Sequence, residues 1–231
     1  MSQAFHKIIL ILLTVLLLTQ VSCKKETIDI ANISYNYFPT DDKRWVIYEV
    51  DSIYHAENDN NNDDSVYTFH FEIREQLDSA FLDGAGRLNQ IVKRFKRKDS
   101  IADWSLTDVW TQTVTTVGAY RNENNICYHK LSYPIGVESY WNGNDANTLA
   151  EEMYSYEYFH EPGFVNGMAF DSTLAVLQID ENNYVERIFG REIYAAGVGL
   201  IYKERDELGK KNGIVVKGLE YRMRLIAFGT N

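Results

Sequence analysis

A period of two in the hydrophobic residues, sustained from Tyr37 onward, constrains this chain more than any other feature. In VYTFHFEIRE (66–75), aromatic and aliphatic residues alternate with polar and charged ones. LEYRMRLIAF (219–228) repeats the pattern near the C-terminus. Successive side chains of a β-strand point to opposite faces of its sheet, so this alternation predicts half-buried strands.

Eight more stretches have strand-like composition, and several are separated only by short loops such as 83–86, 122–125 and 180–183. Loops of this length suit antiparallel hairpins and leave no room for the crossover helices of a parallel sheet. Helix is expected only as short pieces, at 145–154 and 99–104. The predicted class is all-β: an antiparallel, strongly curved sheet, forming an open barrel or a sandwich of about ten strands, with little helix.

The N-terminus has the pattern of a targeting segment. Eleven residues, 8–18, contain a single polar side chain and follow the positive charge of Lys7. This run has the length of a signal-peptide core and is too short to span a bilayer. The Ser22-Cys23 junction is similar to the lipobox of bacterial lipoproteins, although Gln20 stands where that motif has an aliphatic residue. The alternative is an ordinary secretory signal with a chance cysteine.

The lipobox resemblance implies that Cys23 is lipidated and that the chain is cut before it. It divides the sequence into a lipoprotein signal peptide (1–22), a lipidated cysteine with a tether (23–36) and one β-rich domain (37–231). Two or more acyl chains anchor a protein firmly to a membrane. The expected localisation is the cell envelope, lipid-anchored and most simply at the outer membrane, on a side that the sequence leaves open.

The charge of the chain is acidic. Its formal net charge is −10, and 1–22 carries only Lys7, so cleavage makes the protein more acidic still. Nucleic-acid binding rewards clustered Lys and Arg, so no nucleic-acid partner is expected. The one basic run, 87–98, is interpreted as the solvated end of a strand.

The second cysteine has no partner if Cys23 carries lipid. Cys127 lies in the strand-like stretch NICYHKLSY, so we expect a buried, inert thiol. The alternative is a catalytic pair with His129, which alternation places on the same strand face.

Gly197-Val198-Gly199 raises the question of a phosphate cradle. A dinucleotide-binding loop needs a third glycine, where this chain has Tyr202, and then a helix, where this chain has a strand pattern. Gly197 and Gly199 are therefore predicted to be structural glycines at a bend or bulge. No cofactor is expected.

Three stretches resemble a family of uncharacterised lipoproteins from Bacteroidetes: YFPTDDKRWVIYEVDSIY (37–54), KLSYPIGVESYWNGN (130–144) and DSTLAVLQIDENNYVERIFGREIYAAGVGLIYKE (171–204). Together they cover much of the chain after the leader. The resemblance implies an exported, membrane-anchored and mostly β protein. It implies no activity.

Candidate ligand sites are few. Trp141, Tyr154, Tyr156 and Tyr158 would form a ligand or partner face if exposed, and part of the core if buried. The acidic loop 57–64 has alternating oxygen ligands but lacks the glycine and glutamate of a calcium loop, and the histidines lack metal-ligand spacing, so no metal site is expected.

Two functions fit this sequence. The first is a non-catalytic binding or interaction module in the envelope, whose candidate partners are another envelope protein, a glycan or a hydrophobic ligand. The alternative is an envelope hydrolase that acts on glycan or lipid through carboxylates that the sequence does not pair. No catalytic residue is assigned.

The anchor is directly testable. In a bacterium that expresses the full chain, an alkyne analogue of palmitate should label the wild type and the Cys127→Ala variant equally. The Cys23→Ala variant should remain as unlabelled precursor, because the acceptor thiol is lost. Equal labelling of Cys23→Ala and the wild type would contradict the lipoprotein assignment.

Overall fold

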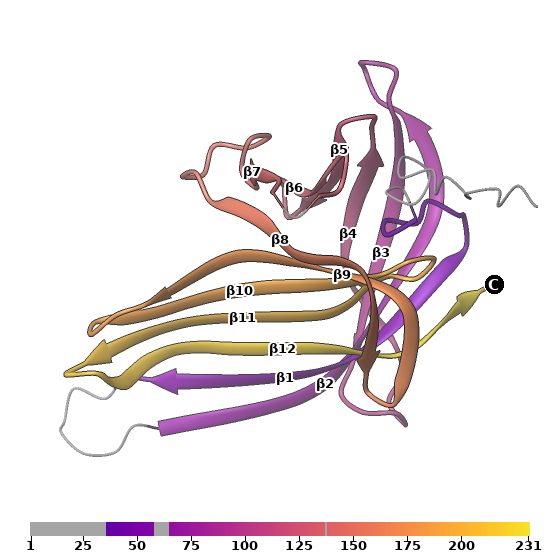
Figure 1. The fold of residues 1–231 in the computed structure, drawn as a ribbon. Helices are drawn as coiled ribbons and strands as arrows, with labels where there is room; N and C mark the ends of the chain where they lie inside the picture. Colours follow the sequence, from indigo (N-terminus) through magenta and orange to yellow (C-terminus); the bar gives the residue numbers. More distant parts are fainter. Residues whose placement is uncertain (1–35, 58–64, 137) are drawn as a thin grey trace, which may run out of the picture.

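A computed structural model describes residues 36–57, 65–136 and 138–231, which form twelve strands in one antiparallel sheet (Figure 1). The order across the sheet is β6-β5-β4-β3-β2-β1-β12-β11-β10-β9-β8-β7. The strands are β1 (Arg44–Ala56), β2 (Ser65–Leu82), β3 (Leu88–Arg97), β4 (Ser105–Val114), β5 (Gly118–Glu123), β6 (Ile126–Ser132), β7 (Tyr140–Asn142), β8 (Met153–Val165), β9 (Met168–Asn182), β10 (Glu186–Ala195), β11 (Gly199–Lys211) and β12 (Ile214–Thr230). The predicted class is confirmed, with twelve strands in place of about ten.

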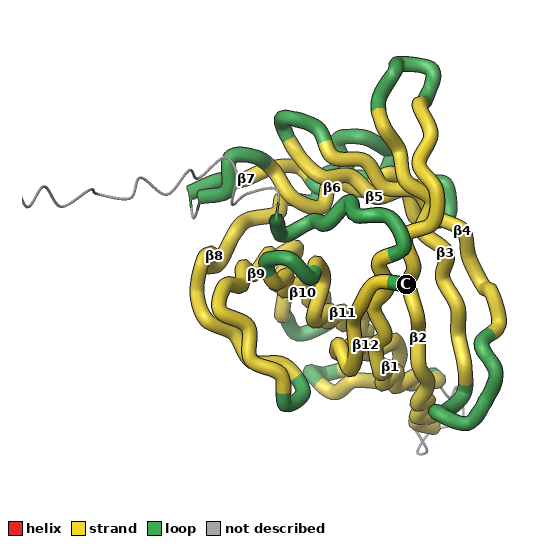
Figure 2. The backbone as a smooth tube through the Cα atoms, turned by 90° about the vertical axis from the view of Figure 1, so that its right-hand side faces the viewer, coloured by secondary structure: helices red, strands yellow, loops and turns green. Residues whose placement is uncertain are grey.

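The sheet is bent so strongly that its strands form a ring (Figure 2). In Figure 1, β10, β11 and β12 run across the view while β3 and β4 run up it. Register shifts interrupt most of the strand pairs, for example between Leu77 and Ala80 on β2 and between Gly209 and Lys210 on β11. Such bulges bend a strand and increase its twist, which lets one sheet curl into a barrel.

The two edges of the sheet are tied together by hydrogen bonds. The amide of His129 on β6 donates to the carbonyl of Gly143, just after β7, at 2.9 Å. The indole of Trp141 donates to the His129 carbonyl at 2.9 Å, and the Asn147 side chain donates to the Cys127 carbonyl at 2.9 Å. These bonds occupy backbone groups that an edge strand would leave open, so the barrel is nearly closed.

The segment before β1 plugs one end of this barrel. Tyr37 and Phe38 are buried, and the Gln112 side chain donates to the Pro39 carbonyl at 3.0 Å. The Gly197 amide donates to the Asn36 carbonyl at 2.8 Å. This indigo segment lies at the right in Figure 1, near the β10–β11 turn and opposite the tips of the β9–β10 and β11–β12 hairpins at the left.

The core has two main apolar clusters. One contains the plug together with buried residues of β5–β10. The other surrounds Tyr48, Val50, Met223 and Leu225, where β1 pairs with β12. All twelve strands and both clusters lie within residues 37–231.

The prediction of short helices at 99–104 and 145–154 is wrong. In both segments, side-chain oxygens accept the backbone amides that a helix would use. The Asp99 carboxylate accepts the amides of Ile101 and Ala102, both at 3.0 Å, and holds 99–104 in a turn. The Asn142 side chain accepts the amides of Asn144 and Glu152 in the same way. Local side-chain acceptors of this kind favour turns over helix. No helix is present in the described part of the chain, and hence none that could cross a membrane.

The glycine pair of the β10–β11 turn has a backbone role. Gly197 and Gly199 have φ values of 72° and 96°, in the left-handed region that glycine adopts at no steric cost. A Cβ on Gly199 would lie 3.2 Å from Cδ of Pro39, so this turn also packs against the plug. A β-strand follows at once, with no helix N-terminus to hold a phosphate.

Substituting these glycines should lower stability. Gly197→Ala should cost about 1 kcal/mol, since its surroundings are open and only the backbone is strained. Gly199→Ala should cost more because of the Pro39 contact. A loss of this size lowers the melting temperature by about 2–4 °C in a domain of this length. Gly84→Ala is the control: its Cβ meets nothing within 4 Å and its φ is not positive. A control shift equal to that of Gly199→Ala in thermal denaturation by circular dichroism would contradict the strain argument.

Candidate functional site

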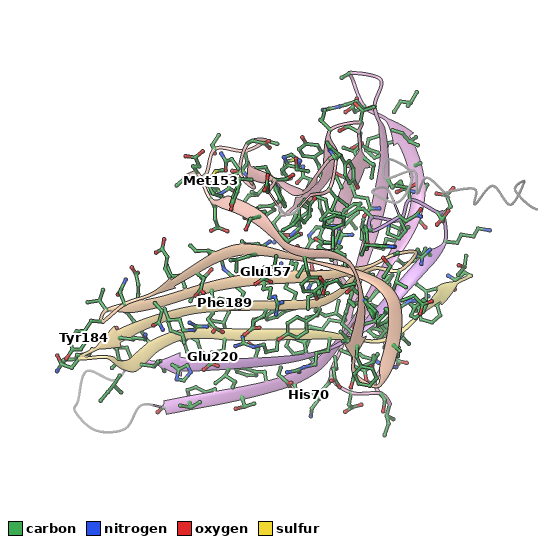
Figure 3. The ribbon with its side chains drawn as sticks, in the orientation of Figure 1. His70, Met153, Glu157, Tyr184, Phe189 and Glu220 are labelled. Carbon is green, nitrogen blue, oxygen red and sulfur yellow. The ribbon has the colours of Figure 1, made fainter. Side chains whose placement is uncertain are left out.

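The interior of the barrel holds a cavity of about 350 Å³ between the β10–β12 side and the β2–β5 side. Figure 3 shows side chains crowding the region where these two sides meet. Ten of the lining residues carry charge, which is unusual for a barrel interior. The cations are Arg44, Arg94, Arg121, Lys130, Lys203 and Arg205, and the carboxylates are Glu75, Glu123, Glu192 and Glu207.

Glu192 on β10 is the most buried of these groups, with no exposed surface. Its carboxylate lies 2.9 Å from Nζ of Lys130 on β6 and 3.2 Å from Nζ of Lys203 on β11. The hydroxyl of Tyr194 donates to its other oxygen at 2.5 Å. Burial alone raises the pKa of Glu192, but Lys130 and Lys203 outweigh it, and the pKa lies well below its usual range.

Lys130 reaches this network from a bulge. The register of β5 and β6 passes from Ala119↔Leu131 to Tyr120↔His129, so Lys130 is the extra residue. Bulges commonly re-aim a side chain. Its Nζ lies 3.3 Å from Glu123 as well as 2.9 Å from Glu192. Burial lowers the pKa of Lys130, but the two carboxylates reverse this and raise it, so the ammonium stays charged.

A second ionic cluster lies on the β2–β5 side. Glu75 accepts from Arg121 at 2.8 Å and lies 3.5 Å from Arg94, so it too is shared by two cations. The other arm of Arg121 donates to the Gln112 side chain at 2.8 Å. The guanidinium of Arg94 lies over the Trp110 ring, 4.5 Å from its centroid.

The cavity therefore has a net positive lining in an acidic protein. Its six cations exceed its four carboxylates, whereas the whole chain carries −10. The Nε atoms of Arg44 and Arg121 are buried without a hydrogen-bond partner. Buried donors left without acceptors are costly and are commonly satisfied by a ligand or water.

The chemistry of these groups suits binding better than acid–base catalysis. A general acid requires a carboxyl whose pKa is raised toward neutrality. Here Glu192 and Glu123 have lowered pKa values, because Lys130 and Lys203 outweigh the effect of burial. Among the described residues, no group of three or more His, Cys, Asp or Glu side chains is placed to hold a metal ion.

The aromatic residues singled out in the sequence lie mostly in the core. Trp141, Tyr154 and Tyr156 are buried, with the Trp141 and Tyr156 ring centroids 4.7 Å apart. Tyr158 is half-buried, and a register shift between Tyr156 and Tyr158 interrupts the expected ladder. This placement matches the core-packing alternative, and the three buried rings present no external face.

Cys127 is half-buried, where a fully buried thiol was expected. It lines a second depression, on the other face of β5 and β6. Burial raises the pKa of its thiol, and Asp145 adds to the effect. His129 Nδ1 lies 2.8 Å from Asp145, while its buried Nε2 has no hydrogen-bond partner. The thiol and imidazole thus do not form a nucleophile–base pair.

Two sequence predictions concern residues that the structure does not describe: Cys23 and residues 58–64 of the acidic loop. The basic run is only partly a solvated strand end, because Arg94 points into the cavity. The interior charges were missed, although Glu75 is in phase with Phe71, Ile73 and Leu77 in its strand. A carboxylate on the apolar face of a predicted strand is the signal that would have indicated these buried charges.

No protein-family model matches the chain, and no curated protein gives a significant match. Among solved structures, it is similar to a presumed exported protein with a YmcC-like fold from Bacteroides fragilis. That likeness has 12% identity and a TM-score of 0.44 over 84% of this chain and 98% of the other. A presumed lipoprotein from Parabacteroides distasonis is similar at 9% identity and a TM-score of 0.44, over 84% and 98%.

The Glu192 network predicts a pH-dependent stability. Because the pKa of Glu192 is lowered on folding, its contribution is complete above the ordinary value of 4.5 and is lost as the pH falls. Glu192→Gln should therefore cost about 3 kcal/mol or more at pH 7, where it breaks a buried pair.

The measurement is urea unfolding of the wild type and Glu192→Gln at pH 7 and pH 4. The difference between them should shrink at pH 4. Glu157→Gln, which removes a partly exposed pair with Arg191, is the matched control and should cost less than Glu192→Gln at pH 7. A Glu192→Gln penalty that is equal at both pH values would contradict the network.

Proposed function

We propose that the protein is a non-catalytic binding module of the cell envelope, which holds a small ligand in the interior of its β-barrel. The observation that carries this proposal is the cavity of about 350 Å³ with its charged lining. That volume is within the range of small-molecule sites. Fixed charges between apolar walls can contact both the polar and the apolar part of one ligand.

The ion pairs of the cavity carboxylates favour this function over the hydrolase alternative. Glu75 and Glu192 are each held between two cations, at distances of 2.8–3.5 Å. Carboxylates fixed in this way orient a ligand well but are poorly suited to deliver or accept a proton. Of the partners considered, a hydrophobic or amphipathic small molecule fits best, because Trp45, Leu77 and Val92 also line the cavity.

The anchor belongs to the same proposal. Lipid on Cys23 would hold the domain to the membrane, and residues 23–36 would form the tether. The chain then enters the barrel as the plug of Tyr37 and Phe38. In this arrangement the plugged end faces the anchor, and the hairpin tips point away from it. The outer membrane is the proposed location.

The neutral fluorescent probe N-phenyl-1-naphthylamine tests the cavity. We expect residues 24–231, which include every described strand, to bind the probe with increased fluorescence. Val46→Trp should abolish binding, because Val46 lines the cavity and a larger side chain would fill it. Val109→Trp is the matched control, since Val109 is exposed on the outer face of β4.

Circular dichroism spectra and melting temperatures establish that both variants fold. Probe binding that Val46→Trp leaves intact, or that the wild type lacks, would overturn the proposed function. Equal loss in both tryptophan variants would likewise count against a site in the cavity.

A further inference from the structure

An exposed apolar surface continues the wall of the cavity toward the hairpin tips. Four side chains form it, and we call them the aromatic strip: Tyr54, Tyr67, Phe69 and Leu219, which are 48, 52, 51 and 39% exposed. The rings of Tyr54 and Tyr67 stack with their centroids 6.5 Å apart. Large apolar side chains clustered on a protein surface mark a binding site more often than scattered ones do.

Strand register places the strip on the same sheet face as the cavity. Tyr54 pairs with both Tyr67 and Leu219 across its two neighbours. On β12, Leu219, Tyr221 and Met223 alternate along one face, and all three line the cavity. Leu219 therefore belongs to both surfaces, and the wall runs without interruption from the cavity to the strip.

The strip lies at the end of the barrel away from the plug. It is formed where β1 ends, where β2 begins and in the first half of β12. These segments reach the left side of Figure 1, whereas residues 36–43 lie at the right. A ligand lying along this wall would have one end among the interior charges and the other on the strip.

The lining of the cavity as a whole has a surplus of positive charge, with six Lys and Arg side chains and four Glu side chains. Within it, Lys130 and Lys203 share Glu192, and Arg94 and Arg121 share Glu75. Lys130 also contacts Glu123, and Arg94 also lies near Asp108. The buried Nε of Arg121 has no hydrogen-bond partner. A ligand with one carboxylate would therefore still leave the charge of the lining positive. It would not need to displace Glu75 or Glu192 from their cations.

We propose that this wall binds a single-chain anionic amphiphile of the long-chain fatty acid class. The inference rests on the proposed function and names its ligand. The carboxylate lies among Arg121, Lys130 and Lys203, and the hydrocarbon chain runs past Leu219 onto the aromatic strip. A cavity of about 350 Å³ suits one acyl chain rather than two, because it is near the lower limit of ligand sites.

Displacement of N-phenyl-1-naphthylamine compares three ligands of equal chain length: dodecanoate, dodecanol and dodecyltrimethylammonium. The protein is residues 24–231, freed of bound lipid on a hydrophobic resin, and all ligands stay below their micellar concentrations. We expect dodecanoate to bind at least tenfold more tightly than the other two, because only it meets the cationic surplus.

Two pairs of variants locate the ends of the ligand. Lys203→Met should weaken dodecanoate at least tenfold and leave dodecanol unchanged, while Glu192 keeps its contact with Lys130. Lys98→Met, at an exposed lysine beyond β3, should change neither. Phe69→Ser should weaken dodecanoate and remove the gain in affinity from octanoate to dodecanoate. Phe164→Ser, at a ring that is 71% exposed, should not.

Heavy-atom quenching gives the orientation. Trp45 and Trp110 line the cavity, whereas the strip contains no tryptophan. We expect 2-bromododecanoate, with bromine beside the carboxylate, to quench tryptophan fluorescence more than 12-bromododecanoate at equal occupancy. Equal or reversed quenching would overturn the proposed orientation.

The outcomes separate this inference from the function on which it rests. If the probe requires the cavity but dodecanoate binds no better than dodecanol, the anionic ligand is wrong and a neutral one takes its place. If Phe69→Ser and Phe164→Ser behave alike, the strip is not part of the site. If Val46→Trp leaves probe binding intact, the proposed function itself fails.

Discussion

The interior of this barrel depends on one buried carboxylate. Glu192 has no access to water, and an ion in that position is tolerable only when it is paired and hydrogen-bonded. Its partners come from β6 and β11, which lie far apart in the strand order. The pairing therefore fixes how the two sides of the barrel face each other, and it does so across the space where a ligand would lie.

The curvature of the sheet creates the cavity inside the barrel. One antiparallel sheet of twelve strands is bent at its register shifts until β6 and the residues around β7 share hydrogen bonds. The plug of Tyr37 and Phe38 fills one end with apolar side chains. The remaining interior is lined by apolar side chains together with the charged clusters. Together these features make a site with a charged inner part and an apolar outer wall, which is the basis of the proposed ligand.

Much of the architecture was predictable from local pattern. The alternation in 66–75 and 219–228 predicted strands that the structure contains, and the turn-rich loops 83–86 and 180–183 predicted hairpins. The two short helices that the sequence predicted are absent, because Asp99 and Asn142 bind nearby amides and favour turns. The candidate site was missed for a different reason. Glu75 and Glu192 occupy positions in phase with apolar neighbours, and their cationic partners lie on other strands.

The sequence by itself determined the class of this protein, because strand alternation and hairpin loops are local properties of the chain. It also determined the acidic charge and the left-handed turn at Gly197 and Gly199, where glycine alone avoids strain. Only the tertiary structure decided which charges are buried and which pair, because Lys130 meets Glu192 across 62 residues of chain. It also decided that Trp141, Tyr154 and Tyr156 belong to the core while Tyr54, Tyr67 and Phe69 stay exposed. Both sets have the same strand pattern, and only the curvature of the sheet determines which of them other strands cover.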